Sequence, residues 1–459
     1  MNRSDDKLGS MPVGKLLVTM SVPMMISMFI QALYNAVDSM FVARLSEDAL
    51  TAVSLAFPLQ NIMIAVAVGT GVGINALVSR SLGEGNIRQA EKAANVQILL
   101  ALVYTLVSIL LGLFFARTYY TNQTDAATII EYGQQYISIV CIWSLGSFLA
   151  QGFEKLLIAT GNATPSMISQ ALGAIVNIAL DPIFIFGWGP IPAFGVRGAA
   201  IATVIGQFCA AICSLILCLI HIRVLRFDLR QMLPNFRILK SIYAVGFPSM
   251  LTIGLTAAMS YFMNSIVLSF STTAAAVFGI WLKLQNFGFM PVFGMNNGTL
   301  AIYSYNCGAK KYDRVFQTIR LAMTVAIGVG LAVTLLYELI PVPLLRLFSA
   351  SDYMLSIGVT AVRLCALSIV FGSVSVIISS VCQALRRPRY TLGINVCRQV
   401  VFQVAAAWVL ARFGRLELVW LAPLIAEVLT MFIALYLGKR VKTMLTAESG
   451  EATAPTGEI

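Results

Sequence analysis

Long apolar runs separated by short polar segments make up most of this chain of 459 residues. Each run is bounded by charge, glycine or proline, and each is long enough to cross a bilayer as a helix, which takes about 20 residues. Twelve spans are predicted, at residues 15–43, 51–79, 94–116, 132–159, 165–187, 198–221, 241–268, 274–305, 318–340, 354–383, 389–411 and 416–438. The runs are continuous rather than alternating, which favours helices over a β-barrel. The first is too long for the apolar part of a cleavable signal peptide and is predicted to be a span.

The composition agrees with this pattern. The chain is 58% hydrophobic and 11% charged, with a mean hydropathy of +0.84, whereas soluble domains carry about 25% charged residues. These values exclude a soluble multidomain protein and a disordered one. None of the eight cysteines forms a C-x-x-C or zinc spacing, so they are predicted to pack helices. The sequence therefore predicts an all-α polytopic protein of the cell (inner) membrane, surrounded by lipid.

The basic residues predict the orientation. The formal net charge is +11, but no soluble stretch is available to carry a nucleic-acid groove, so we expect no nucleic-acid partner. With both termini inside, the predicted cytoplasmic segments hold 22 Lys and Arg residues, Lys155 among them, and the outer loops hold six. Cytoplasmic loops are enriched in Lys and Arg. Both termini are therefore predicted to be cytoplasmic.

The two halves of the sequence resemble each other at one constant offset. Pro23 matches Pro248, and at the same spacing Gln60-Asn61 matches Gln285-Asn286. We predict a six-helix lobe at 1–222, a linker at 223–240, a second six-helix lobe at 241–442 and a disordered cytoplasmic tail at 443–459. An even number of spans per repeat gives both halves the same orientation, so we expect a pseudo-two-fold axis along the membrane normal. Two such lobes suit a transporter that works by alternating access.

Polar residues inside predicted spans are functional candidates, because an acid at the centre of a span costs about 2.5–3.5 kcal/mol on insertion scales. Asp38, Asp181 and Thr203 each lie six residues from the outer end of a span, which is about 9 Å at 1.5 Å per residue. Asn177 is one helical turn before Asp181 and shares its helix face. The four side chains are predicted to meet and to bind a proton or a small hard cation such as Na⁺. The alternative is that each acid is hydrated at the interface.

Other residues carry less specific predictions. Pro23 removes a backbone hydrogen bond from the first span and is a candidate hinge, although a passive kink would look the same in sequence. Arg398 and Glu427 lie near mid-depth on consecutive spans and are predicted to form a structural ion pair. Lys283 could repel cations, bind an anionic group or extend to the interface.

An ordered set of segments resembles the multidrug and toxic compound extrusion (MATE) family, in its DinF/MepA-like branch. The resemblance covers all twelve spans and rests on Ser21-Val-Pro, Gln31-Ala-Leu-Tyr-Asn-Ala-Val-Asp-Ser-Met-Phe-Val, Ala49-Leu-Thr-Ala-Val-Ser-Leu-Ala-Phe-Pro, Gly83-Glu-Gly-Asn, Asn177-Ile-Ala-Leu-Asp-Pro and Gly195-Val-Arg-Gly-Ala-Ala-Ile-Ala-Thr. It implies cation-coupled drug export, with the coupling pocket of this branch at Asp38, Asn177, Asp181 and Thr203 and the bending proline at Pro23. Spans seven, eight and ten, which carry carboxylates in another branch, offer no central acid here.

The predicted function is therefore a secondary antiporter that exports amphipathic, mostly cationic drugs in exchange for H⁺ or Na⁺. Polar residues in both lobes are candidates for the substrate cavity: Gln31, Tyr34, Gln60, Asn61, Asn264, Lys283 and Gln285. The alternative is a lipid-linked saccharide flippase of the same superfamily, which Lys283, Arg363 and Arg398 would suit. An enzyme is not expected, because the chain has one histidine and no nucleophile–base pair. We expect a monomer without a cofactor.

Overall fold

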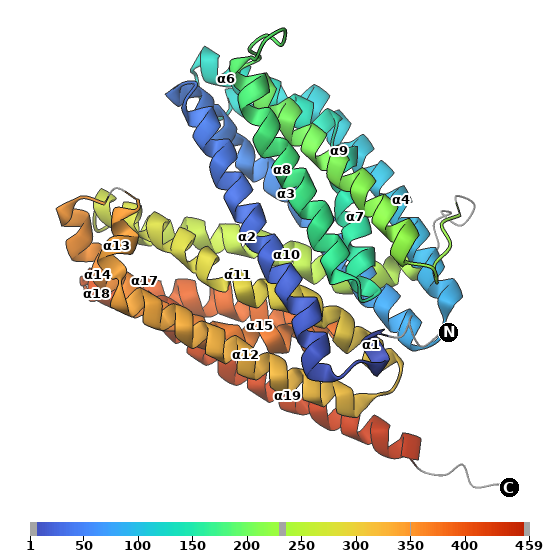
Figure 1. Ribbon diagram of the computed structural model, residues 1–459. Helices are drawn as coiled ribbons and strands as arrows, with labels where there is room; N and C mark the ends of the chain where they lie inside the picture. Colours follow the sequence, from blue (N-terminus) through green and yellow to red (C-terminus); the bar gives the residue numbers. More distant parts are fainter. Residues whose placement is uncertain (1–6, 229–235, 349, 454–459) are drawn as a thin grey trace, which may run out of the picture. The chain divides into compact units, whose positions relative to one another are not determined.

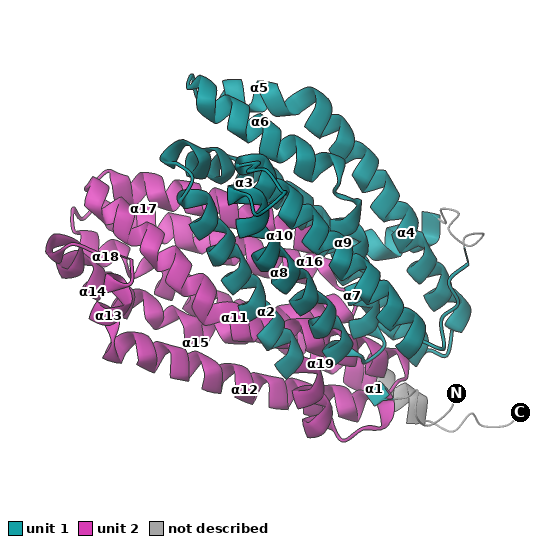
Figure 2. Cartoon of the chain, turned by 45° about the horizontal axis from the view of Figure 1, so that its top comes forward, with its two compact units in different colours: residues 1–8, 22–247 teal, residues 9–21, 248–459 magenta. Residues whose placement is uncertain are grey.

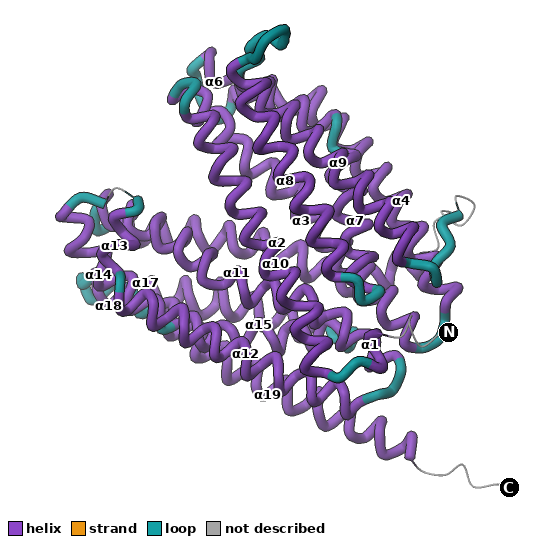
Figure 3. The backbone as a smooth tube through the Cα atoms, in the orientation of Figure 1, coloured by secondary structure: helices purple, strands orange, loops and turns teal. Residues whose placement is uncertain are grey.

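The computed structural model describes residues 7–228, 236–348 and 350–453. Helices account for nearly all regular structure in these ranges (Figure 1, Figure 3). An isolated bridge between Trp188 and Ile191 is their only β pairing. The prediction of an all-α polytopic membrane protein is confirmed.

The first half of the chain contains the helices up to α9. They are α1 (Lys7–Ser10), α2 (Val13–Ala43), α3 (Glu47–Gly83), α4 (Ile87–Leu110), the π-helix η1 (Leu111–Phe115), α5 (Ala116–Thr121), α6 (Ala127–Ile142), α7 (Leu145–Ala159), α8 (Ala163–Phe186) and α9 (Val196–His221).

The second half follows a similar order. Its helices are α10 (Phe236–Leu268), α11 (Thr272–Gly308), α12 (Tyr312–Leu339), α13 (Pro341–Arg346), α14 (Asp352–Ala366), α15 (Ser368–Ala384), α16 (Pro388–Val396), the π-helix η3 (Cys397–Val404), α17 (Ala405–Ala411), α18 (Leu416–Val419) and α19 (Ala422–Thr453).

Ten helical stretches of the described ranges are long and apolar enough to cross a membrane, with adjoining helices such as α14 and α15 counted as one stretch. The bent pair α6–α7 makes an eleventh. This pair covers the predicted fourth span, but it is broken between Ile142 and Leu145 and bent by 49°. The predicted eighth span is α11, which is 37 residues long. Its hydropathy is lowered by Lys283, Gln285 and Asn286, so it is not among the ten.

Two helices extend into regions that the sequence predicted to be a linker and a disordered tail. The helix α10 begins at Phe236, inside the predicted linker 223–240. The helix α19 continues to Thr453, past Thr443, where the disordered tail is predicted to begin. Residues 229–235 of the linker and 454–459 of the tail lie outside the described residues.

Local structure repeats between the two halves at the same offset as the sequence. Ser46 caps the start of α3, and its hydroxyl accepts from the Ala49 N–H at 3.0 Å. Ser271, at the matching position of the second half, does the same for α11 and accepts from Ala274 at 3.0 Å. A hydroxyl at this position satisfies an amide that the first helical turn leaves unpaired.

The chain divides into two compact units, coloured separately in Figure 2. Unit 1 contains residues 1–8 and 22–247, and unit 2 contains residues 9–21 and 248–459. The predicted lobes instead keep each first helix whole. The chain changes unit three times. The first change lies between Leu8 and Gly9 in the short helix α1. The other two fall inside long helices beside a proline: α2 changes between Ser21 and Val22, and α10 changes at Pro248.

The start of α10 belongs to unit 1 and the start of α2 belongs to unit 2. In each case the helix packs closely against a glycine of that unit. In unit 1, a Cβ added at Gly73 of α3 would lie 2.2 Å from the Ile242 carbonyl oxygen of α10. In unit 2, a Cβ added at Gly298 of α11 would lie 2.5 Å from the Met20 carbonyl oxygen of α2. Gly73 and Gly298 hold matching positions of the repeat. Close backbone approach through small residues is a common way for helices to associate in membranes.

Candidate functional site

Three helices of unit 1 bring together the polar residues that the sequence singled out. Asn177 and Asp181 lie one turn apart on α8, and Thr203 lies on α9. The Asn177 amide nitrogen is 3.4 Å from Asp181 Oδ1 and 3.3 Å from Thr203 Oγ1. Turning the amide over improves both contacts: the nitrogen then donates to Asp181 Oδ2 at 3.3 Å, and the oxygen accepts from the Thr203 backbone N–H at 3.1 Å. Asn177 therefore links the acid of α8 to α9.

Asp38 of α2 is the second carboxylate of this region. Asp38 is 8% exposed, and Asp181 is 0% exposed. The Oδ1 atom of Asp38 is buried without a hydrogen-bond partner among the described residues. Asp38 and Asp181 are close enough for their charges to repel each other. Two acids in one water-poor region favour a state in which a proton or another cation reduces their charge.

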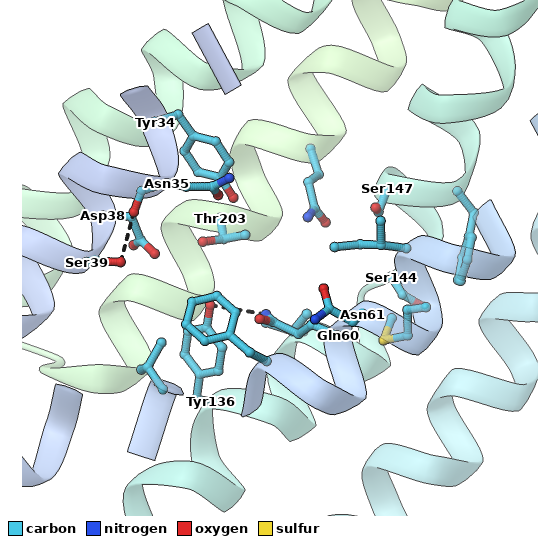
Figure 4. A pocket seen from close by; sticks show the side chains of 17 residues that line it. Tyr34, Asn35, Asp38, Ser39, Gln60, Asn61, Tyr136, Ser144, Ser147 and Thr203 are labelled. Carbon is cyan, nitrogen blue, oxygen red and sulfur yellow. Dashed lines mark hydrogen bonds between the residues drawn. The ribbon is translucent and has the colours of Figure 1, made fainter. Parts of the chain in front are cut away.

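Asp38 and Thr203 line a cavity of about 180 Å³ within unit 1. Tyr34, Gln60 and Asn61, which the sequence proposed for a substrate cavity, also line it. Figure 4 shows Tyr34, Asp38 and Thr203 grouped on one side of the view.

The cavity wall combines phenol, amide and aromatic side chains. The Gln60 amide donates to the Tyr136 hydroxyl at 3.3 Å. Tyr34 and Tyr136 both lie within electrostatic range of Asp38 and Asp181. Phe57 and Phe148 add apolar surface. A cavity with one lining carboxylate, aromatic rings and neutral amides offers an organic cation both charge pairing and ring contacts.

Several polar residues of this cavity were not predicted from the sequence. Ser144 and Ser147 lie on the other side of the view in Figure 4, at the start of α7. Gln207, one turn after Thr203 on α9, also lines the cavity. Buried Ser144 Oγ and Gln207 Oε1 have no hydrogen-bond partner among the described residues. The i,i+4 spacing of Thr203 and Gln207 was a usable signal, whereas Ser144 became recognisable only from the break between α6 and α7.

The remaining residues proposed for substrate do not line this cavity. Gln31 lies on α2, one turn before Asn35, and is exposed. Asn264, Lys283 and Gln285 lie on α10 and α11 in unit 2. Their part in binding stays a prediction.

The charged residues inside unit 2 have nearby partners. Arg398 Nε is 3.8 Å from Glu427 Oε1, as expected for the ion pair, with both side chains largely buried. Arg363 Nε is 3.6 Å from Glu338 Oε2. The Lys283 ammonium lies 5.6 Å from the centre of the Phe348 ring. Whether the Arg398–Glu427 pair is structural in role stays a prediction.

Two buried charges in unit 1 were not anticipated. Glu154 is 3% exposed and Lys155 is 8% exposed, and both lie inside α7. Lys155 was counted among the charges of the cytoplasmic segments. It lies inside α7, where helix packing covers it, and its assignment to the cytoplasmic side stays a prediction. In the described part of the chain, no three His, Cys, Asp or Glu side chains are grouped as metal ligands.

Comparison with known proteins identifies the family. The MatE family model matches residues 23–183 and again residues 248–409. The two matches start at Pro23 and Pro248, the pair of prolines that marks the repeat. The chain therefore belongs to the MatE family of transporters, as the resemblance implied, and it is not an enzyme.

Relatives of similar length support this assignment. The "FAD transporter" of Shewanella oneidensis is 27% identical over 450 residues, covering 94% of this chain and 96% of the relative. "Multidrug export protein MepA" of Staphylococcus aureus is 24% identical over 442 residues, covering 96% of each chain.

A solved structure has the same fold. It is described as the outward-facing conformation of a multidrug resistance MATE family transporter of the MOP superfamily. It matches with a TM-score of 0.89 and 25% identity, over 96% of this chain and 99% of that one. This chain is accordingly a multi-pass membrane transporter of the multidrug efflux family.

Proposed function

We propose that this protein is a secondary antiporter that exports amphipathic organic cations in exchange for H⁺ or Na⁺. In this proposal Asp38, Asn177, Asp181 and Thr203 form the coupling site. The substrate occupies the adjoining cavity of unit 1. The protein works as a monomer in the cell membrane, with both termini in the cytoplasm.

The observation that carries the proposal is the position of Asp38. Its carboxylate lines the cavity, has a buried oxygen without a partner among the described residues and lies near a second buried acid, Asp181. A buried carboxylate without a cationic partner is costly. A bound proton, a sodium ion or the ammonium group of a substrate would each remove that cost.

Competition for the same charge supplies the coupling. When the two carboxylates are charged, the cavity attracts an organic cation. When they are protonated or bind Na⁺, that attraction is lost and the substrate leaves. Export and cation entry then exclude each other at one site, which is the requirement for antiport.

Pro23 is the proposed hinge of this cycle. It lies inside α2, the helix that carries Asp38. A proline removes one backbone hydrogen bond from a helix and lowers the cost of bending there. Bending at Pro23 would change the position of Asp38 relative to α8 and α9.

The test is transport by the purified protein in liposomes loaded with a fluorescent lipophilic cation such as ethidium. A pH gradient and a sodium gradient are imposed separately, each with the membrane potential clamped. Substrate movement against the direction of one imposed gradient supports the proposal and identifies the coupling ion. Equal movement with and without both gradients would contradict antiport.

A second candidate is export of a phosphate-bearing substrate. A relative is named as an FAD transporter, and Lys283, Arg363 and Arg398 are cations in unit 2. Two of these three lie beside carboxylates, which reduces their attraction for an anion. The organic-cation proposal is therefore favoured, and uptake of FAD or of a lipid pyrophosphate in the same liposomes decides between them.

A further inference from the structure

Glu154 is a buried acid that the proposed coupling site does not use. It lies on α7 five residues before the last helical residue, Ala159, which is about 7.5 Å at 1.5 Å per residue. In the predicted topology this end of α7 is cytoplasmic. An ionisable side chain at membrane depth is a functional candidate by default, because lipid and packed helices solvate it poorly.

The neighbours of Glu154 are mostly neutral. The Ser169 hydroxyl of α8 lies 3.5 Å from Glu154 Oε1, and the Gln170 side chain of the same helix lies near the carboxylate. The thiols of Cys213 and Cys218 on α9 lie within electrostatic range. Among the described residues, Glu154 takes part in no ion pair. No neighbouring side chain neutralises the Glu154 carboxylate by an ion pair, so a bound proton is what would neutralise it.

Lys155 is the charged group nearest in sequence, and it points elsewhere. Consecutive residues of a helix do not face the same neighbours. The Lys155 side chain packs against α3, where a Cβ added at Gly71 would lie 2.7 Å from Lys155 Cγ. Lys155 still lies within electrostatic range of Glu154.

Glu154 also lies apart from the cavity. Ser147, seven residues earlier on α7, lines the cavity, and Glu154 does not. Seven residues correspond to about two turns, or roughly 10 Å along the helix. In the predicted topology, the carboxylate lies between the cavity and the cytoplasmic end of unit 1.

We propose that Glu154 is a second proton-binding site that releases the coupling proton to the cytoplasm. This inference rests on the proposed antiport and requires that the coupling ion is H⁺. The proton leaves the Asp38–Asp181 pair, binds the Glu154 carboxylate and then passes to water on the cytoplasmic side. Glu154 binds one proton and releases one proton, so it returns to its initial charge and no other reactant is consumed.

Glu154→Gln separates this role from a structural one. Glutamine has nearly the same shape, and its side-chain oxygen accepts the hydrogen bond from Ser169 that the carboxylate accepts. Replacing buried charged groups by neutral groups of similar shape is often neutral or stabilising for folding. A purely structural Glu154 would therefore tolerate the change. A proton carrier would not, because an amide does not titrate.

The experiment compares net export with exchange in liposomes. Net export of ethidium is driven by a pH gradient, whereas exchange of labelled for unlabelled ethidium is measured at equal pH and needs no net proton release. We expect Glu154→Gln to lower net export by at least about tenfold, a modest effect for losing a proton-transfer group, while exchange stays near wild type. The matched control is Glu131→Gln, an exposed acid of α6 in the same unit, which should preserve both rates.

A second variant and the wild type complete the test. Glu154→Asp keeps a titrating group and should recover part of the net export. Unchanged net export in Glu154→Gln would overturn this inference and leave the antiport proposal intact, as would loss of net export and exchange together. If wild-type export is not driven by a pH gradient, both this inference and proton coupling fail.

Discussion

Asp38 and Asp181 are close enough to interact, although they lie on different helices. Asn177 holds Asp181 by a hydrogen bond and reaches Thr203 on α9, while Asp38 has an unpartnered oxygen among the described residues. A proton or cation bound at either acid changes the cost of charge at the other. Interacting groups of this kind titrate as a unit.

Asp38→Asn and Asp181→Asn should therefore be non-additive in transport. Either variant alone should lose nearly as much gradient-driven export as the double variant, because one missing charge already breaks the shared site. The measurement is initial efflux rate in proteoliposomes for the two single variants and the double. Losses that multiply would indicate two independent acids.

A second residue-scale feature is backbone strain at equivalent positions of the repeat. Gly85 has φ of +73°, and Lys310, its equivalent in the second half, has φ of +56°. The same holds for Gly161 and Arg386, at +84° and +55°. A side chain in this left-handed region costs about 1–2 kcal/mol, so the second half keeps strain that the first half avoids.

Lys310→Gly should therefore raise thermal stability, by about 1 kcal/mol in the free energy of unfolding. Gly85→Ala, at a site where a Cβ would meet no atom within 4 Å, should lower stability by a similar amount through strain alone. The measurement is the midpoint of thermal unfolding in detergent. A Lys310→Gly protein less stable than wild type would show that the lysine side chain outweighs its backbone strain.

At the scale of elements, glycines allow long helices to pack with their backbones in close contact. The start of α10 lies against α3 at Gly73 within unit 1, and the start of α2 lies against α11 at Gly298 within unit 2. In each case the backbone of one helix occupies the space where a side chain would be. The helix ends are thereby fixed by backbone contact.

Gly73→Ala and Gly298→Ala should each destabilise the protein by about 1–3 kcal/mol, the usual cost of overpacking. The matched control is Gly279→Ala on α11, where a Cβ meets nothing within 4 Å. That control should be neutral or slightly stabilising, since alanine favours helix over glycine. Thermal unfolding of the three variants in detergent gives the comparison, and equal stability of all three would exclude the close backbone approach.

At the scale of the whole molecule, the distribution of basic residues predicts which loops face the cytoplasm. Gln123, after α5, is predicted to be outside, and Arg88, at the start of α4, is predicted to be inside. Both residues are exposed. In cells with native thiols blocked beforehand, a membrane-impermeant maleimide should label Gln123→Cys and spare Arg88→Cys. Labelling in the reverse order would invert the topology, and with it the direction assigned to Glu154.

The sequence by itself determined the features that depend on neighbouring residues. Apolar runs specified the helices, because a backbone inside lipid must satisfy its own hydrogen bonds. The constant offset between matching residues marked the repeat. Equal distances from the outer helix ends suggested that Asp38, Asp181 and Thr203 belong at one depth, with Asn177 one turn from Asp181 on the same helix face.

Only the tertiary structure decided which side chains share a space. Ser144 reaches the cavity because the fourth span breaks before it. Glu154 and Lys155 are buried by α8, α9 and α3, although Lys155 was counted from the sequence among the cytoplasmic charges. The first turns of α2 and α10 group by contact and not by sequence order. The physical reason is common to all three: burial depends on neighbours distant in sequence, and hydropathy along one helix carries no information about them.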